Sequence, residues 1–388
     1  MKQYKYLYRK MLDEGIIRKA YKNLRKHKTK RKEIIYIDAH LDEEVQKMRI
    51  MILNTKPEGI KVTNPELRYI PLERKPKIIY EHGKERKICM PEIHEQWLHH
   101  IIILILAPII LAISYEFSCG SFPGRGAHYG KRQIERWLRK DTKGMKYFLK
   151  IDIRHFYNNI RVDILFKELK TRIKDEWFLH VIRACLTGFK KGIPLGFYIS
   201  QWLANYMLEY LDKFILSEYN VYVRYMDDMT IFSSSKKKLR KVLCDIKQIL
   251  GRRYRLKLKH NYQICRMHYE GKRIMGCPLD FMGFLFYRNK TIIRKNILIS
   301  ATRLVNKMRK AKALRRGYYY KHIVALLSYI GWFSCTNTYD AYRMYIKPYI
   351  NIKNLKKIVS KLKRRQNDET MDNRTMCNTT RRNTAYCA

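Results

Sequence analysis

The sequence predicts an α+β fold, in which a small β-sheet carries acidic residues and helices make up most of the remaining chain. Three observations support this class. Residues 221–232 place β-branched and aromatic residues on both sides of two adjacent acids, a pattern typical of a β-hairpin. Residues 147–157 form a second β-rich run, which contains another acid and ends in polar side chains. Apolar residues at helical spacing recur between residues 299 and 350.

The acids of the predicted hairpin are Asp227 and Asp228, which lie at a tight turn between bulky residues. Two carboxylates in such a place repel each other and lose hydration, and ligands that offer only oxygen favour Mg²⁺ or Mn²⁺. An Asp-Asp pair alone is more often an ordinary solvated turn. The third acid, Asp152, at the end of the neighbouring β-rich run, favours a metal site instead. Three such acids can hold two divalent ions, which clamp the attacking and leaving oxygens of an in-line phosphoryl displacement.

These runs together resemble the palm motifs of bacterial reverse transcriptases. Tyr225-Met-Asp-Asp228 is similar to the family's Tyr-x-Asp-Asp box, and Asp152 with Phe156-Tyr157 is similar to its first palm carboxylate and aromatic gate. The resemblance implies a right-hand polymerase fold with fingers, palm and helical thumb. It also implies that Asp152, Asp227 and Asp228, with the backbone of Ile153, hold two Mg²⁺ ions. Tyr157 would then stack under the nucleotide sugar and exclude a 2′-hydroxyl.

The composition favours a polyanionic partner. The 388 residues include 82 Lys and Arg against 34 Asp and Glu, a net charge of +48. Such a charge repels itself unless nucleic acid neutralises it, and an acidic membrane surface is the competing interpretation. Nine scattered cysteines without a C-x-x-C pair fit a reducing cytoplasm. The apolar run 101–113 has only 13 residues, which predicts a buried helix rather than a membrane span.

Residues 1–63 read as a basic helical extension, and residues 64–145 as fingers with part of the palm. Residues 69–72 and 77–80 are β-like, with a turn at His82-Gly83. The run that follows resembles the fingers motif in which a cation on a β-hairpin grips the incoming triphosphate. Arg86 is the best match and Lys84 the second, although an isolated run of this kind is usually surface charge. Arg suits the role because its planar fork holds two phosphate oxygens.

The palm is assigned to residues 146–290, with a loop and helix at Gly192–Asn205. Gly196 would let the backbone approach the nascent base pair closely. Most reverse transcriptases have Gln before this glycine, whereas this chain has Leu195, and Gln201 closes the motif. This pattern resembles the reverse transcriptases of diversity-generating retroelements, and some anti-phage and unassigned bacterial enzymes share parts of it. The apolar side chain of Leu195 can pack against a nucleotide but cannot hydrogen-bond to it, so weak copying fidelity is expected.

The remaining motifs lie in the last third of the chain. Lys259 resembles the palm lysine that protonates pyrophosphate, with Lys257 as the second choice. Phe281 and Gly283 match the primer-grip hairpin, and Arg294-Lys295 the basic pair at the entrance of the thumb. The thumb is assigned to residues 291–352. Residues 353–388 are a basic tail, the last 25 or so of which are expected to be disordered.

The resemblance therefore implies an RNA-directed DNA polymerase that copies an RNA template from a DNA or RNA primer with dNTPs, in a bacterial or phage-encoded cytoplasmic setting. A structured noncoding RNA and a small basic accessory protein are further partners implied by the retroelement type. Group II intron, retron and defence reverse transcriptases are relatives. An intron maturase normally adds a DNA-binding region and often a Cys-rich endonuclease, and a retron enzyme a Val-Thr-Gly thumb motif, none of which is found. An anti-phage defence enzyme and a non-catalytic RNA-binding scaffold stay open as alternatives.

Overall fold

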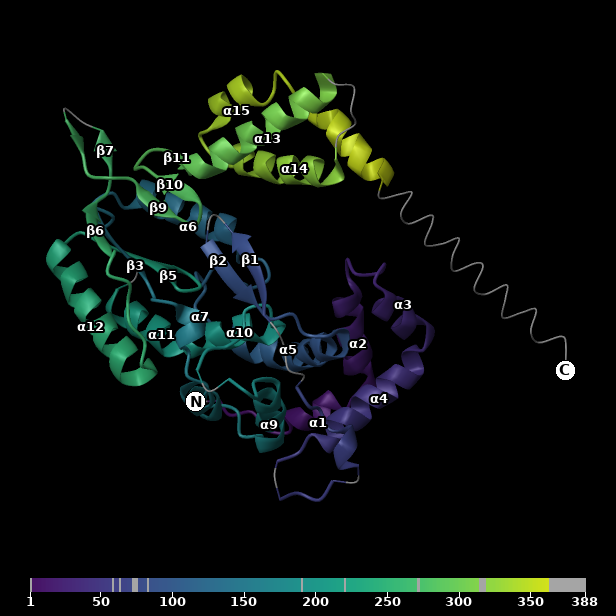
Figure 1. The fold of residues 1–388 in the computed structure, drawn as a ribbon. Coiled ribbons are helices and arrows are strands. Elements are labelled where there is room, and N and C mark those ends of the chain that lie inside the picture. Colours follow the sequence, from purple (N-terminus) through teal and green to yellow (C-terminus); the bar gives the residue numbers. More distant parts are fainter. Residues whose placement is uncertain are drawn as a thin grey trace. The chain divides into compact units, whose positions relative to one another are not determined.

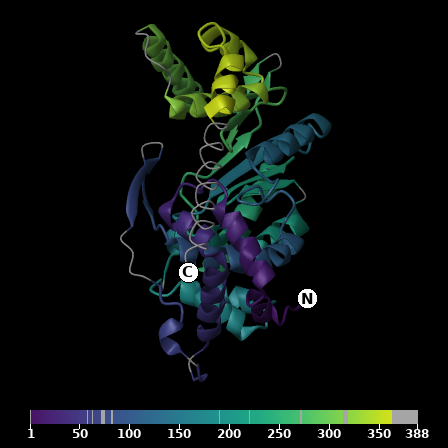
Figure 2. The ribbon, with the colours of Figure 1, turned by 90° about the vertical axis from the view of Figure 1, so that its right-hand side faces the viewer.

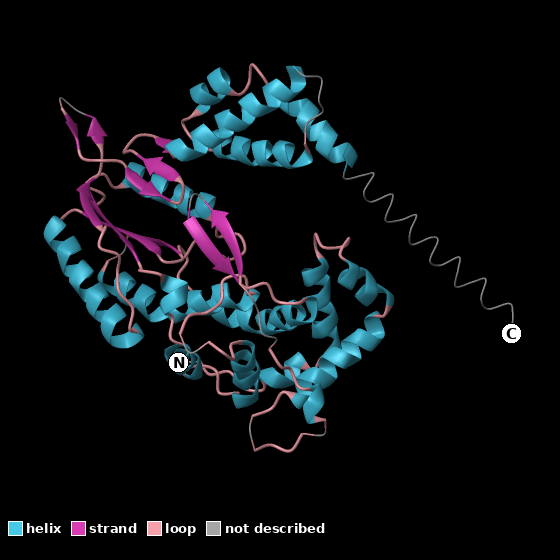
Figure 3. Cartoon of the chain, in the orientation of Figure 1, coloured by secondary structure: helices cyan, strands magenta, loops and turns pink. Residues whose placement is uncertain are grey.

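The computed structural model describes residues 2–57, 59–62, 64–71, 76–81, 84–189, 191–219, 221–270, 273–313 and 319–362. The chain forms two compact units, which meet in sequence between Arg266 and Met267. Helices and antiparallel strands occur in both units, which confirms the α+β prediction (Figures 1 and 3). The second unit begins at Met267 and includes the expected primer-grip hairpin as well as the residues assigned to the thumb.

The first unit contains one four-stranded antiparallel sheet in the order β4-β5-β3-β6. Its strands are β3 (Tyr147–Asp152), β4 (Tyr222–Tyr225), β5 (Asp228–Ser233) and β6 (Gln263–Arg266). Helix α12 (Lys236–Tyr254) packs against β3, β5 and β6 through an apolar stripe. Branched and aromatic residues dominate the two central strands because their side chains are buried, Phe148 and Ile231 among them.

Helices surround this sheet and extend the same hydrophobic core. They are α1 (Leu7–Met11), α2 (Glu14–Arg25), α3 (Lys32–Ala39), α4 (Leu41–Asn54), η1 (Pro65–Leu67), α5 (Ile93–Ile113), α6 (Ala127–Lys140), α7 (Phe156–Asn159), α8 (Val162–Lys170), α9 (Glu176–Cys185), α10 (Tyr198–Met207) and α11 (Glu209–Glu218). Helix α5 packs against α2 on one side and α10 on another, so the N-terminal helices share a core with the sheet-bearing region (Figure 1). Helices α8 and α9 are separate, and the Asp175 side chain caps the start of α9 by accepting from the Phe178 amide.

The length of the apolar run 101–113 argues against a membrane span, and helix α5 corrects that argument. It has 21 residues rather than 13 and, within the described part of the chain, is the one helix long and apolar enough to cross a membrane. In its most apolar window 56% is buried inside the protein, with Trp97 and Leu106 fully enclosed. Burial, and not length, is therefore what favours a core helix here.

The strands β1 (Lys77–Glu81) and β2 (Lys84–Ile88) form the predicted fingers hairpin, which Figure 2 shows from the side. The two turn residues between them lie outside the described part. The expected strand at 69–72 is not found over its described residues 69–71. Pro71 lacks the N–H that a strand ladder needs, which explains the difference.

The second unit combines two small sheets with helices. Its elements are β7 (Tyr269–Glu270), β8 (Ile274–Met275), β9 (Leu279–Phe281), β10 (Phe284–Phe286), β11 (Thr291–Ile293), α13 (Lys295–Ala313), α14 (Tyr320–Ser334) and α15 (Tyr339–Tyr345). Helices α13 and α14 enclose a separate core that includes Val305, Ile323 and Phe333. Residues 352–362, which include the start of the predicted basic tail, are helical. Residues 363–388 of the predicted tail lie outside the described residues.

Candidate active site

The predicted acidic hairpin is formed by β4 and β5, which are joined by a two-residue turn. Tyr225 pairs with Asp228, so Met226 and Asp227 make the turn. Met226 has a φ of 56°, in the left-handed region that two-residue hairpin turns use. A side chain there costs roughly 1–2 kcal/mol, which the surrounding contacts of this turn must offset.

The strand that carries Asp152 ends beside this turn. In the β3–β5 ladder Asp152 lies opposite Asp228. The next residue, Ile153, donates its N–H to the Asp227 carbonyl at 3.2 Å. Two segments that are 75 residues apart in sequence are therefore held together by backbone hydrogen bonds.

Asp152 and Asp227 interact electrostatically. Burial and the neighbouring Asp152 carboxylate together raise the pKa of Asp227 to about 6, against the opposing charge of Lys259. Oxygen Oδ1 of Asp152 is buried, and it has no hydrogen-bond partner among the described residues. A buried carboxylate oxygen beside a second acid suits a cation with oxygen ligands such as Mg²⁺.

The three acids do not form a ready-made metal site. Within the described ranges, no group of three or more Asp, Glu, His or Cys side chains is placed to hold a metal ion. Asp227 lies in the turn and Asp228 is the first residue of β5, so the two side chains need not face Asp152 together. The observed pair is Asp152 with Asp227, and Asp228 and the Ile153 backbone lie next to it in the ladder.

Lys259 is the cation that contacts this pair. Its Nζ lies 2.5 Å from Asp152 Oδ2, and its amide donates to the Asp152 carbonyl at 2.8 Å. Lys257 makes no such contact, although its carbonyl accepts from the Arg154 amide at 2.8 Å. The lysine is thus placed to carry a proton to or from a group bound at Asp152.

Tyr157 and Arg86 both lie near the acids. Burial raises the pKa of Tyr157, and the charge of Asp227 raises it further, whereas Arg224 and Arg86 oppose this shift. Arg86 is on β2 opposite Ile79, so the fingers hairpin brings a cation toward the tyrosine ring. Lys84 begins β2, but its side chain lies outside the part of the chain that the structure describes.

The Leu195-Gly196 segment is tied to the fingers strand. The Leu195 carbonyl accepts from the Cys89 amide at 2.8 Å. Gly196 has a φ of 103°, and a Cβ there would lie 2.2 Å from the Cys89 carbonyl oxygen. The close approach that requires glycine is therefore to Cys89 of this chain, and not only to a nascent base pair as predicted. Gln201 is exposed on the first turns of α10.

A buried polar network behind the hairpin was missed by the sequence analysis. Arg224 of β4 is 1% exposed and donates to Asp212 at 2.8 and 2.5 Å. It also donates to Asn205 Oδ1 at 2.9 Å and to the Met226 carbonyl at 3.1 Å. Burial alone would lower the pKa of Arg224, but Asp212 reverses this and raises it. An arginine inside an apolar strand was the available sequence signal.

The network reaches Gly120 in the loop before α6. Asn205 donates to the Gly120 carbonyl at 2.9 Å, and the Met226 side chain lies against the same glycine. A Cβ on Gly120 would be 2.6 Å from the sulfur of Met226 and 2.8 Å from its backbone nitrogen. The turn that carries Asp227 is thus held from behind by packing as well as by hydrogen bonds.

The expected primer-grip residues lie in the second unit. Phe281 and Phe284 are fully buried. Gly283 has a φ of 87°, and a Cβ there would meet the Trp332 ring at 2.8 Å. Arg294 donates to Asp280 at 2.7 Å, so this cation is paired within its own unit, whereas Lys295 is exposed at the start of α13.

Comparison with known proteins identifies the family. The profile described as "Reverse transcriptase (RNA-dependent DNA polymerase)" matches residues 74–273. Curated relatives include protein YkfC of Escherichia coli, which is 24% identical over 39% of this chain and 43% of its own length. Group II intron-encoded protein LtrA of Lactococcus lactis is 26% identical over 54% of this chain and 35% of its own length. The chain thus matches less than half the length of either relative.

Among solved structures, apo telomerase from Candida tropicalis has a TM-score of 0.45 and 13% identity over 62% of this chain and 50% of the telomerase chain. The profile match spans both acidic motifs, the fingers hairpin and the Lys259 segment. Since that match also takes in more than half of the residues, the chain belongs to the reverse transcriptase (RNA-dependent DNA polymerase) family.

Proposed function

We propose that the chain is an RNA-directed DNA polymerase that extends a primer by two-metal nucleotidyl transfer. The observation that supports this most is the Asp152–Asp227 pair at the end of the four-stranded sheet, where burial and mutual repulsion favour a bound cation. Family membership supports the reaction class. The RNA template, DNA or RNA primer and dNTPs are the substrates proposed with it.

In this proposal Asp152 and Asp227, with Asp228 and the Ile153 carbonyl beside them, hold two Mg²⁺ ions, for which Mn²⁺ can substitute. The ions would lower the pKa of the primer 3′-hydroxyl and neutralise the leaving pyrophosphate. Lys259, released from Asp152, protonates the pyrophosphate. Arg86 holds the triphosphate, and the ring of Tyr157 lies under the sugar and disfavours a 2′-hydroxyl.

Asp227→Asn tests this function directly. The substitution keeps the shape of the side chain but removes a charge that the cation needs, so dNTP incorporation on an RNA template should fall roughly a hundredfold or more. RNA binding in a filter assay should change little, because the substitution removes none of the Lys and Arg side chains that bind the RNA backbone. Full synthesis by the variant would overturn the assignment.

A non-catalytic RNA-binding scaffold is the rival from another class. Such a protein would bind RNA without needing a divalent ion. Primer extension and filter binding with and without Mg²⁺ separate the two, because only a polymerase has an activity that disappears when the ion is removed.

We further propose that copying is error-prone, as in diversity-generating retroelements. The support is Leu195, whose side chain offers only apolar contact where most family members have Gln. Apolar contacts discriminate by only about 1–3 kcal/mol, whereas a hydrogen-bonding group discriminates more strongly.

Leu195→Gln should therefore lower the misincorporation rate several-fold. Sequencing of cDNA made on one defined RNA measures it, with Leu195→Met, which keeps an apolar side chain of similar size, as a control for general damage at this position. An unchanged error rate in an active Leu195→Gln enzyme would contradict the fidelity proposal.

The biological setting is proposed on sequence grounds. A retroelement role predicts a structured RNA and a small basic accessory protein as partners in a bacterial cytoplasm. The alternatives are a defence or unassigned bacterial reverse transcriptase. A role within an intron is a further alternative, because one relative is encoded by a group II intron. A pair of near-identical DNA repeats beside the gene, differing at adenines, would favour the retroelement role.

A further inference from the structure

One side of helix α12 is cationic and lies beside the edge strand β6 in the first unit (Figure 1). Lys236, Arg240 and Lys247 are exposed there, and their spacings of four and seven residues place them on one side of the helix. The single acid of α12, Asp245, lies half a turn away from Lys236. Its charge adds to burial in raising the pKa of Tyr219, which comes from the other side of the helix. The side of α12 beside β6 therefore carries cations without an acid from the same helix.

Two tyrosines extend this cationic side onto the sheet. Lys236 Nζ lies 5.4 Å from the ring centroid of Tyr147, the first residue of β3. Lys247 Nζ lies 4.4 Å from the ring centroid of Tyr262, which directly precedes β6 and is 39% exposed. The helix side and the edge of the sheet thus form one surface, in which ammonium groups and phenol rings alternate.

Two further cations lie at the Tyr147 end of this surface. Lys146 Nζ is 5.6 Å from the same ring, and Arg266 lies opposite Tyr147 in the β3–β6 ladder. Wherever the structure describes the chain, no ion pair joins any of the five cations to an acid. Contact with an aromatic ring does not neutralise an ammonium group, so five like charges repel one another unless a polyanion binds. The five cations and two tyrosines are called the α12–β6 surface below.

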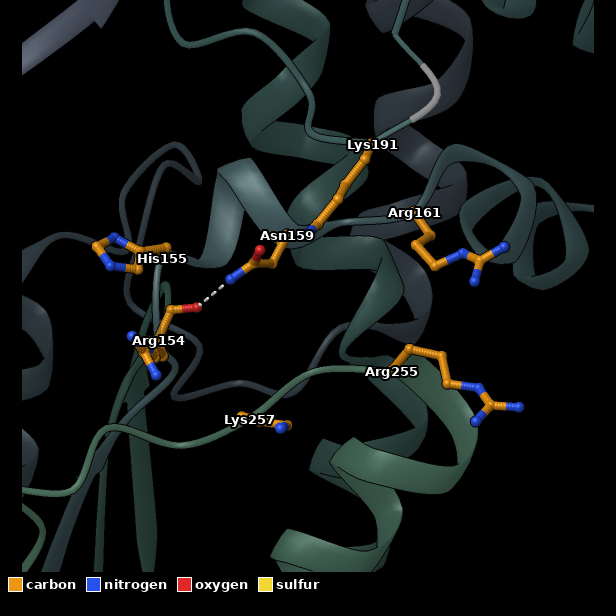
Figure 4. A pocket seen from close by; sticks show the side chains of 7 residues that line it. All are labelled: Arg154, His155, Asn159, Arg161, Lys191, Arg255 and Lys257. Carbon is orange, nitrogen blue, oxygen red and sulfur yellow. Dashed lines mark hydrogen bonds between the residues drawn. The ribbon is translucent and has the colours of Figure 1, made fainter.

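The α12–β6 surface leads away from the candidate active site. Tyr147 begins β3 and Asp152 ends it, so roughly 17 Å of strand separates the Tyr147 end from the acids. A cationic hollow of about 620 Å³ lies at the other end of β3 (Figure 4), and its lining includes Arg154, Lys191 and Arg255. That hollow belongs to the candidate active site, because Arg154 follows Asp152 by two residues. A polyanion bound along the whole α12–β6 surface is instead a chain that extends beyond the reacting centre.

The mixture of charges and rings indicates the kind of polyanion. Duplex RNA presents its phosphates and hydroxyls, while its bases are paired. Sites for single strands combine a cationic track with aromatic rings on which bases stack. Gln263 lies opposite Lys150 and Arg266 opposite Tyr147, so three to four strand residues, or roughly 10–13 Å, separate the two rings. A nucleotide chain spans this separation, whereas a single base does not.

We propose that the α12–β6 surface binds single-stranded RNA, with phosphates on its cations and bases on the rings of Tyr262 and Tyr147. The RNA is either the unpaired part of a template or a separate molecule. Its role in copying rests on the proposed function, but the binding itself does not.

Tyr262→Leu tests base stacking in the full chain. The probe is a labelled oligouridine of about 20 nucleotides, and fluorescence anisotropy measures its binding without primer, dNTP or divalent ions. We expect the affinity to fall roughly fivefold or more, because a base loses the ring beneath it. Tyr262→Phe keeps the ring and should bind as the unmodified chain does. Tyr262 is exposed, so neither substitution disturbs the core.

A blunt RNA duplex of about 20 base pairs is the second probe. Tyr262→Leu should leave the affinity for the duplex unchanged, because paired bases cannot stack on the ring. An equal loss for duplex and oligouridine would overturn the single-strand assignment, since it would show that the surface recognises only the backbone.

The charges are tested by a triple variant. Lys236→Gln combined with Arg240→Gln and Lys247→Gln removes three of the five cations, and oligouridine binding should weaken roughly tenfold or more.

The matched control removes the same charge from exposed lysines of α1, α2 and α8, by Lys10→Gln combined with Lys19→Gln and Lys167→Gln. It should weaken binding by no more than about threefold, through the lower net charge alone. Equal weakening by both triple variants would overturn the proposal, because the effect would then belong to the chain as a whole.

Primer extension identifies the source of the RNA. If the surface holds the unpaired part of the template, the Lys236, Arg240 and Lys247 variant raises the KM for a primed template with a long overhang and not for one with a short overhang. If it holds a separate RNA, both KM values stay unchanged and only oligouridine binding falls. An active polymerase whose variants bind oligouridine normally would refute the surface and leave the proposed function standing. A chain that makes no DNA but shows the predicted losses of binding would do the reverse.

Discussion

Asp227 carries the largest electrostatic cost at the candidate active site. Its carboxyl is mostly buried, and its pKa is raised from 3.8 to about 6 by burial and by Asp152. Lys259 offsets part of this cost but contacts Asp152 and not Asp227. The acid is therefore poorly stabilised as an anion until a further cation binds, which is what a residue with a metal-binding role requires.

The raised pKa predicts a specific pH dependence of stability in the metal-free chain. Folded Asp227 holds its proton up to about pH 6, while the unfolded chain releases it near 3.8, so this residue lowers the unfolding free energy as pH rises between these values. The full effect is on the order of 2–3 kcal/mol. Asp227→Asn removes it, and urea unfolding of both chains from pH 4 to pH 7 measures the difference.

The variant and the unmodified chain should be equally stable near pH 4, with the variant gaining stability above it. Adding Mg²⁺ at pH 7 should narrow the gap, because a cation stabilises the ionised acid only in the unmodified chain. Parallel stability curves across the whole range would contradict the raised pKa.

At the scale of elements, the hairpin β4–β5 depends on two helices and a loop that lie outside it in sequence. Helices α10 and α11 supply Asn205 and Asp212, which bind Arg224, and the loop before α6 supplies Gly120. A buried arginine without its partners costs several kcal/mol, so these three contacts are coupled. They fix the conformation of Met226, and with it the direction of the Asp227 side chain.

Gly120→Ala tests this support. Its Cβ would lie 2.6–2.8 Å from Met226 atoms that include the backbone nitrogen, so the turn must shift. We expect dNTP incorporation to fall roughly tenfold or more and stability to fall by about 1–3 kcal/mol. Gly126→Ala is the matched control, because a Cβ there meets nothing within 4 Å. Normal activity in Gly120→Ala would show that the turn position is not set by this contact.

At the scale of the whole molecule, the net charge of +48 dominates the expected behaviour. Acidic side chains are too few to neutralise the Lys and Arg, and ion pairs such as Arg224–Asp212 use acids for internal structure. The remaining cations can act together on a nucleic acid backbone, which gives affinity without sequence specificity.

RNA binding should therefore depend steeply on salt. For single strands the slope of log affinity against log salt is about −0.7 per neutralised phosphate, so a chain that neutralises five or more should give about −3.5 or steeper. Filter binding between 50 and 200 mM salt measures this slope. Removing the acidic charge of Asp227 by Asn should leave the slope unchanged, and a nearly flat dependence would contradict backbone binding.

The sequence by itself determined the fold class, the hairpin with its turn at Met226-Asp227, and the choice of Asp152 as the third acid. These features depend on local patterns, such as strand-forming residues around acids, which short segments display directly. The resemblance added Lys259 and Arg86, which the structure places beside Asp152 and Tyr157.

Only the tertiary structure decided which groups actually meet. It showed that Asp227 pairs with Asp152 without forming a three-acid set, that Gly196 is required by the Cys89 carbonyl, and that Arg224 supports the turn. It also brought Arg154, Lys191 and Arg255 together around one pocket. Such contacts join residues far apart in sequence, and local propensity carries no information about the distance between them.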